Sequence, residues 1–209
     1  MHRLGFDIQQ LQAIISRLEN SSNDFCIHLM SHFASADDSE AQFVSFTRQQ
    51  LEKFSIATEA YEYPKSLANS AGMVNYPESR YHWVRPGIFL YGAGAFEKPV
   101  VPEAVMQLES EVIAIKTVQV GESVGYGNQW TAERKSLIGV VAIGYGDGYP
   151  RHAPSGTPVL INGEKLPLVG RVSMDMITVD LTDAEQPISI GDKAILWGKD
   201  LSVDEIASY

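Results

Sequence analysis

The sequence has little that would suit a secreted, membrane-spanning or nucleic-acid-binding protein. Its one cysteine, Cys26, excludes a disulfide within the chain and fits a reducing cytosol. No run approaches 18 uncharged apolar residues, and the N-terminus lacks the basic-then-apolar order of a signal peptide. Sixteen Lys and Arg residues stand against 26 Asp and Glu, a net charge of −10, which argues against a nucleic-acid or anionic-membrane partner. We therefore expect a cytoplasmic protein, in which Cys26 is a buried apolar side chain.

The chain has the bulk composition of an ordinary globular protein. It holds 209 residues, 44% of them hydrophobic and 10% aromatic. This length allows one large domain or two small ones, and a chain of this size buries roughly 70% of its unfolded surface. The pattern of apolar residues changes near residue 100, which favours two parts.

The first part alternates helical and strand-like patterns. Apolar spacing predicts a helix over 6–20 with Asp7 as its N-cap, and a second helix from Asp37 or Asp38 to Phe54. The other segments are expected to be a strand at 25–33, a strand at 55–60, a loop or helix start at 66–72, and a strand at 82–91 broken by Pro86 and Gly87. Such alternation is typical of a parallel sheet with helical crossovers.

The second part is rich in strands. Residues 97–102 are expected to form a linker, and five strands are predicted at 105–120, 137–143, 158–161, 166–181 and 193–197. Hairpin turns are predicted at Asn162-Gly163 and Gly191-Asp192. The sequence thus predicts an α/β domain over residues 1–98 and a mostly β domain over residues 99–209.

Four glycine-rich or arginine-containing motifs stand out. The longest is Gly144-Tyr-Gly-Asp-Gly-Tyr-Pro-Arg151, and the others are Val84-Arg-Pro-Gly-Ile88, Val124-Gly-Tyr-Gly127 and Val169-Gly-Arg-Val-Ser-Met-Asp175. Glycines this close together permit sharp turns or let backbone approach a ligand, and tyrosines offer flat walls with a polar tip. Asp147 and Asp175 follow no metal-ligand spacing, so no metal site is expected.

Each of these motifs also has a purely structural interpretation. Tyr126 between two glycines is typical of a surface turn, and Arg85 of a strand end. Ser70 could cap a helix, bind a phosphate, or do both. His32 and Met174 would ordinarily be core residues. The residues taken singly leave these alternatives open.

Together the motifs resemble the bacterial alanine racemases, fold-type III enzymes that use pyridoxal 5'-phosphate (PLP). The resemblance extends over essentially the whole chain and includes Met1-His-Arg-Leu-Gly-Phe6, Ser31-His-Phe-Ala-Ser-Ala-Asp37 and Ala68-Asn-Ser-Ala71. It implies that the first part is the C-terminal portion of a PLP-binding (β/α)8 barrel, followed by the family's C-terminal β domain. It also implies a homodimer whose active sites draw on both subunits.

The resemblance implies a role for nine residues. Tyr126 is the base that acts on the L-alanine face in a two-base mechanism, with His32 beside it. Arg85 faces the pyridine nitrogen of PLP, and the phosphate is held by Ser70, Gly87 and Ile88. Arg3 and Met174 contact the substrate carboxylate, Met174 through its backbone, and Tyr145 lines the entrance. The family usually has alanine where this chain has Gly146, a difference that should not affect the chemistry.

An arginine beside the pyridine nitrogen has a chemical consequence. Guanidinium does not readily give up a proton, so Arg85 would keep the nitrogen unprotonated and weaken the cofactor as an electron sink. A short-lived carbanion favours racemisation over transamination. The implied activity is the interconversion of L- and D-alanine, with D-alanine supplied for cell-wall peptidoglycan.

The family's PLP-binding lysine motif, Lys-Ala-Asn-Ala-Tyr-Gly, does not occur in this chain. A (β/α)8 barrel takes about 250 residues, far more than the first part offers. We therefore expect an internal fragment of an alanine racemase that is inactive alone. Its first hundred residues should either be poorly folded or be completed by a partner segment. One alternative is an inactive module that dimerises with or regulates a full-length racemase; a more remote one is a related PLP decarboxylase or broad-specificity racemase.

Overall fold

The computed structural model describes residues 1, 3–94 and 100–209 and divides the chain into two compact units, Met1–Pro102 and Glu103–Tyr209. Each unit is described separately below. The predicted linker at 97–102 lies partly outside the described residues. Within the described ranges, no helix is both long and apolar enough to span a bilayer.

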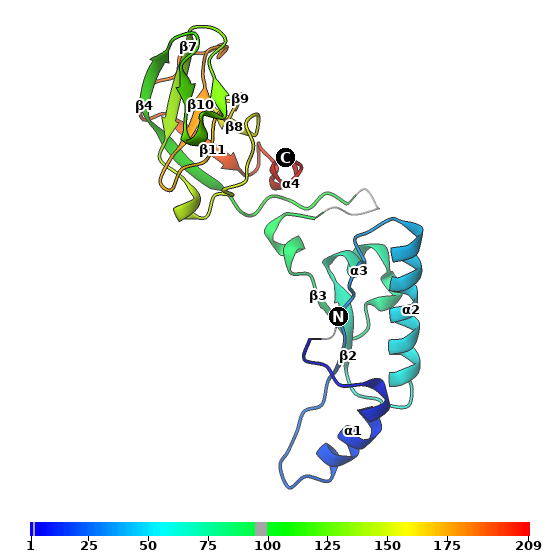
Figure 1. Ribbon diagram of the computed structural model, residues 1–209. Helices are drawn as coiled ribbons and strands as arrows, with labels where there is room; N and C mark the ends of the chain where they lie inside the picture. The colour runs from blue at the N-terminus through cyan, green and yellow to red at the C-terminus, as the bar shows by residue number, and fades with distance from the viewer. Residues whose placement is uncertain (2, 95–99) are drawn as a thin grey trace. The chain divides into compact units, whose positions relative to one another are not determined.

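The first unit has a three-stranded parallel sheet in the order β1-β2-β3 (Figure 1). Its strands are β1 (Leu29–Met30), β2 (Lys65–Asn69) and β3 (Trp83–Arg85). Its helices are α1 (Leu11–Glu19), α2 (Ala41–Thr58) and α3 (Ser70–Asn75), with short 3-10 turns η1 (Ile8–Gln10), η2 (Pro77–Ser79) and η3 (Ile88–Tyr91). The helices and the sheet share one apolar core that includes Ile15, Leu29, Phe33, Phe54 and Leu67.

Local signals explain part of this pattern. Asp7 caps η1 as predicted, because its carboxylate accepts a hydrogen bond of 3.0 Å from the Gln9 amide. Asp38 accepts one from the Glu40 amide but does not cap α2, whose N-cap is Glu40. The strand predicted at 55–60 is wrong, since α2 continues to Thr58 and Thr58 Oγ1 donates to Phe54 O. Regular pairing in the 25–33 run is limited to Leu29–Met30, and Cys26 is exposed rather than buried.

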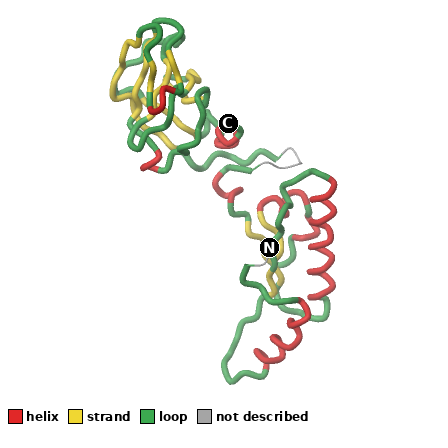
Figure 2. Tube along the Cα trace, viewed as in Figure 1, coloured by secondary structure: helices red, strands yellow, loops and turns green. Residues whose placement is uncertain are grey.

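The second unit is built on a six-stranded antiparallel sheet in the order β10-β7-β4-β11-β8-β9. The strands are β4 (Leu108–Val118), β7 (Ser136–Val141), β8 (Pro158–Ile161), β9 (Glu164–Pro167), β10 (Ile177–Asp180) and β11 (Lys193–Trp197). A bridge between Leu168 and Val179 joins the two edges of the sheet. The sheet is therefore nearly closed around a core that includes Val112, Val141 and Leu196. Figure 2 shows the strands of this unit in yellow.

Smaller elements complete the second unit. They are the hairpin β5 (Ser123–Val124) and β6 (Trp130–Thr131), the turns η4 (Tyr126–Asn128) and η5 (Tyr145–Asp147), and the terminal helix α4 (Val203–Ala207). The predicted turn at Asn162-Gly163 joins β8 to β9, and both residues have positive φ, 51° and 84°. The strand predicted at 166–181 is two strands, because residues 168–176 between them form a loop.

Candidate active site

The carboxyl ends of the three parallel strands bring together most of the site residues predicted in the first unit. Ser31 and His32 follow β1, Ser70 follows β2, and Arg85 ends β3 just before Gly87. The carboxyl ends of parallel strands lie at the same end of the sheet, and in barrel enzymes this end carries the active site.

Arg85 is the best anchored of these side chains. Its Nη1 donates to Ser66 Oγ, and its Nη2 lies within hydrogen-bond distance of Ser31 O, of Leu67 O at 3.3 Å and of His32 Nδ1 at 3.2 Å. Ser31, Ser66 and Leu67 were not predicted from sequence. A backbone carbonyl can be supplied by any residue type, so the sequence holds no signal for Ser31 and Leu67.

His32 is half-buried and faces positive charge. Since a guanidinium can only donate, Nδ1 of His32 accepts the hydrogen bond from Arg85. Burial, together with the charges of Arg85 and Arg3, lowers the pKa of His32 below its ordinary value. The pKa of the Arg85 guanidinium is also lowered, by burial and by Arg3. The imidazole is therefore held neutral, and Arg3 contributes its charge to the same site.

Ser70 is the first residue of α3 and is buried. The helix cap is Asn69 rather than Ser70, because Asn69 Oδ1 accepts from the Gly72 amide at 2.9 Å. Ser70 Oγ instead accepts from the Phe89 amide at 3.2 Å, which links α3 to η3. Among the described residues the Ser70 hydroxyl donates to no carbonyl, so its proton is available to a ligand.

Gly87 and Ile88 form the turn after β3. The Gly87 amide donates to Arg85 O at 2.9 Å, and space beside Gly87 is open, since an added Cβ would meet no atom within 4 Å. Ile88 is 56% exposed. The Ser70 hydroxyl and the open backbone at this turn fit an oxyanion such as a phosphate group, although the Gly87 amide already has one acceptor.

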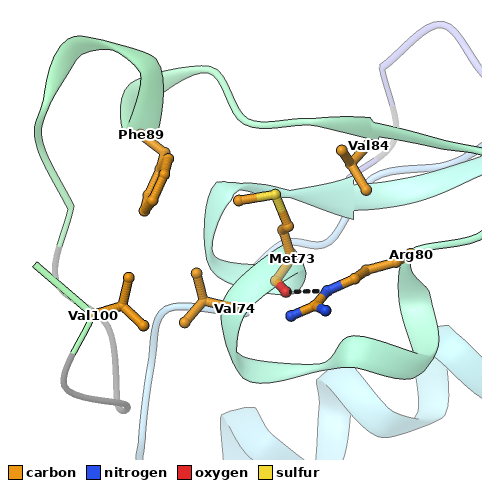
Figure 3. A pocket seen from close by; sticks show the side chains of 6 residues that line it. All are labelled: Met73, Val74, Arg80, Val84, Phe89 and Val100. Atoms are coloured by element: carbon orange, nitrogen blue, oxygen red, sulfur yellow. Dashed lines mark hydrogen bonds between the residues drawn. The ribbon is translucent and has the colours of Figure 1, made fainter. Parts of the chain in front are cut away.

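An apolar pocket of about 390 Å³ lies in the same unit (Figure 3). Met73, Val74, Val84, Phe89 and Val100 line it together with Arg80, whose Nε donates to Met73 O at 2.6 Å. None of the predicted site residues lines this pocket. Its almost wholly apolar walls do not suit a phosphate or an amino acid.

In the second unit, three loops carry Tyr126, Tyr145 and Met174. All three side chains are exposed, at 68%, 41% and 57%. The Tyr145 amide donates to Ser173 O at 3.0 Å, and the Gly146 amide donates to Met174 O at 2.8 Å. These bonds fasten the Tyr145 loop to the Met174 loop.

Glycines allow these loops to approach one another. A Cβ on Gly144 would lie 2.3 Å from Met174 O and 2.4 Å from Ser173 O. A Cβ on Gly170 would lie 2.8 Å from Val124 O, and Gly125 packs on the Arg171 backbone in the same way. Gly125 and Gly127 on either side of Tyr126 have positive φ, 78° and 72°. The loop 170–175 therefore lies against both tyrosine loops.

No group of three His, Cys, Asp or Glu side chains in the described ranges is arranged to hold a metal ion. The two units thus contain an arginine–histidine cluster at the end of a parallel sheet and a set of tyrosine-bearing loops on a β domain. A partial parallel α/β sheet followed by an antiparallel β domain, carrying these residues, is the arrangement that the family resemblance implies.

The chain belongs to the alanine racemase family. Residues 1–95 match the family model for the alanine racemase N-terminal domain, and residues 105–209 match the model for its C-terminal domain. The combined β/α-barrel and β-domain fold predicted from sequence is confirmed.

Curated relatives and solved structures agree with this assignment. The chain is 49% identical to the alanine racemase of Shewanella amazonensis over 99% of its own length and 57% of the relative's. It is 48% identical to that of Vibrio parahaemolyticus, covering 59% of that protein. It matches the structure of biosynthetic alanine racemase from Pseudomonas aeruginosa with a TM-score of 0.90 and 45% identity, covering all of this chain and 58% of that one. The chain therefore spans somewhat more than half the length of these relatives.

A further match is the alanine racemase of Bartonella henselae, whose structure has covalently bound pyridoxal phosphate. The TM-score is 0.84 at 32% identity, and the match covers 100% of this chain and 58% of that one.

Proposed function

We propose that this chain supplies the C-terminal part of a PLP barrel (residues 1–98) and the β domain (residues 99–209) of an alanine racemase. The complete protein would interconvert L- and D-alanine and provide D-alanine for peptidoglycan. The observation that carries the proposal is the cluster of Arg85, His32 and Arg3 at the carboxyl end of the parallel strands.

PLP would be held at the carboxyl ends of these parallel strands. The Ser70 hydroxyl, with Gly87 and Ile88, would bind its phosphate, and the Arg85 guanidinium would face its pyridine nitrogen. When bound, PLP spreads negative charge from the α-carbon of the amino acid into its ring and so acidifies the α-proton. Because Arg85 is fixed by Ser66, Ser31 and Leu67, its guanidinium is already oriented before any ligand arrives.

Tyr126 would remove the α-proton on the L-alanine face. We infer that it comes from a second copy of the protein, so that the homodimer shares its active sites. Arg85 donates to Nδ1 of His32, which leaves the proton of the neutral imidazole on Nε2. That N–H can donate to the Tyr126 oxygen and stabilise its phenolate form. Arg3 and the Met174 backbone would bind the substrate carboxylate, and Tyr145 would line the entrance.

The test is to assay the complete protein with PLP for loss of optical rotation from L-alanine. We expect racemisation of alanine and a visible absorbance from bound cofactor, and we expect neither from the 209-residue chain alone. Turnover of a different amino acid, or decarboxylation, would replace alanine racemisation as the function. A complete protein with no activity that alters the rate of a separate racemase would favour the alternative of a regulatory module.

A further inference from the structure

One face of the run 26–30 in the first unit carries three side chains that can bind a metal ion. Ile27 and Leu29 pack into the apolar core of the unit, whereas the residues between and beside them are exposed. The exposed residues are Cys26, His28 and Met30, and Met30 is exposed by 68%. This alternation places a thiol, an imidazole and a thioether on the same side of an extended segment.

The thiol and the imidazole are in direct contact. Cys26 Sγ lies 3.3 Å from His28 Nε2. A tetrahedral metal ion with the bond lengths of zinc, about 2.3 Å to sulfur and about 2.0 Å to nitrogen, holds the two ligand atoms about 3.5 Å apart. The sulfur and the nitrogen are therefore already spaced as ligands of one ion, and binding needs little movement of either side chain.

The fold holds the imidazole from a second side. The His28 ring stacks on Trp83, the first residue of β3, with ring centroids 6.2 Å apart and an angle of 30° between the planes. The backbone of the run is tied to the neighbouring chain, because the Leu29 amide donates to Pro64 O at 2.9 Å. Trp83 is distant from His28 in the sequence, so the position of the ring depends on the folded sheet.

We propose that Cys26, His28 and Met30 form a binding site for a soft metal ion, copper(I). Thiolate and thioether sulfur favour copper(I), and imidazole also suits copper, whereas magnesium, calcium and manganese take oxygen ligands. Met30 can turn toward the ion, since its unbranched side chain has three rotatable bonds. On binding, the Cys26 thiol releases its proton to solvent and the thiolate donates an electron pair to copper, which keeps its oxidation state.

The test is a titration of the 209-residue chain with copper(I) in acetonitrile-containing buffer without oxygen. The Met30 methyl signal and the His28 ring signals are followed by NMR. We expect both sets of signals to shift together and to saturate at one copper per chain, and we expect binding to strengthen as the pH rises, because the thiol must lose its proton. Absence of any shift, or shifts of His28 without the Met30 methyl, would overturn the proposal.

Variants separate the three ligands. Loss of a group that only supports a ligand already weakens metal binding by about 10- to 100-fold, so Cys26→Ser should cost about 100-fold or more, and His28→Gln and Met30→Leu about tenfold or more each. Met176→Leu is the matched control, since Met176 is an exposed methionine of the second unit, and it should leave binding unchanged. Unchanged binding in Met30→Leu, or zinc bound as tightly as copper(I), would contradict a site for a soft ion.

Fluorescence tests whether the site depends on the fold. Bound copper should quench Trp83 because His28 stacks on it, and the quenching should disappear in Trp83→Phe, which retains Trp130 and Trp197 of the second unit. Equal quenching in Trp83→Phe would place the copper elsewhere. The three proposed ligands are exposed, so far-UV circular dichroism of their variants should match that of the unchanged chain. These experiments need neither PLP nor racemase activity, so their failure is separate from that of the proposed function.

Discussion

Arg85 Nη2 donates a hydrogen bond of 3.2 Å to Nδ1 of His32, across the carboxyl ends of β1 and β3. This contact joins two residues that lie 53 positions apart in the chain. It fixes which imidazole nitrogen carries the proton in the neutral ring. It also places a permanent positive charge beside an imidazole whose pKa is lowered by burial and by that charge.

The first prediction concerns the ionisation of His32. Its pKa should lie below 6.5, because burial and the charges of Arg85 and Arg3 disfavour the protonated ring. NMR titration of the ring signals measures this, and ¹⁵N shifts should show the proton on Nε2 at neutral pH. Arg85→Gln should raise the pKa of His32, while Arg48→Gln, on the exposed side of α2, should not.

The same lowering of the pKa of His32 has a consequence for stability. The unfolded chain binds a proton at this residue near pH 6.5, whereas the folded chain does so only at lower pH. The free energy of unfolding should therefore fall as the pH drops from about 6.5 through the folded-state pKa. Urea unfolding at several pH values tests this, and His32→Gln should flatten the dependence in that window. An equally steep dependence in His32→Gln would assign it to other groups.

The second prediction concerns the contact between the Tyr145 and Met174 loops. Gly144→Ala should destabilise the second unit by about 1–3 kcal/mol, because the new Cβ would overlap two backbone carbonyl oxygens at 2.3–2.4 Å. Gly146→Ala is the matched control, since its Cβ would lie 3.0 Å from Met174 O and needs only a small shift. Thermal unfolding of the two variants should separate them clearly. A Gly144→Ala variant as stable as Gly146→Ala would show that the loops are not in contact as described.

The third prediction compares the two units. The first unit has edge strands β1 and β3 whose outer sides are unpaired within the described residues, and large apolar side chains such as Met30 and Trp83 are exposed by 68% and 58%. The second unit has a nearly closed sheet. Limited proteolysis of the 209-residue chain should therefore cut residues 1–94 first and leave a fragment close to 103–209. Preferential digestion of residues 105–209 would contradict this.

Much of the fold could be predicted from the sequence where local chemistry decides it. The strands at 158–161 and 193–197 and the Asn162-Gly163 turn were correct, because the turn residues beside these strands are local signals. The strand predicted at 55–60 was wrong, because apolar residues in a short run do not distinguish a helix end from a strand. Whether such a run forms a strand depends on pairing with a segment distant in the chain, and a single sequence does not reveal that pairing.

The candidate site was predictable to a different extent. The motifs and the family resemblance gave all nine residues, and the structure brings Arg85, His32 and Arg3 within electrostatic reach of one another. The contacts that orient Arg85 use the carbonyls of Ser31 and Leu67, which no residue type specifies. Asn69 rather than Ser70 caps α3, because Asn69 is the last residue with extended backbone angles before the helix. Both residue types are suitable caps, so the sequence does not distinguish them. The roles of the nine residues stay predictions.

The most direct test of the account is proton exchange at the α-carbon of alanine in D₂O, catalysed by the complete protein with PLP. Replacing Tyr126 by Phe should slow exchange of the L-alanine α-proton by about 10² to 10⁴, because the proton acceptor on that face is lost. Tyr61→Phe changes a tyrosine that stacks on Tyr63 and precedes the amino end of β2, so it should leave the rate unchanged. We expect exchange of D-alanine to fall less than that of L-alanine in Tyr126→Phe. Undiminished exchange of L-alanine in that variant would contradict the assignment of Tyr126 as the base.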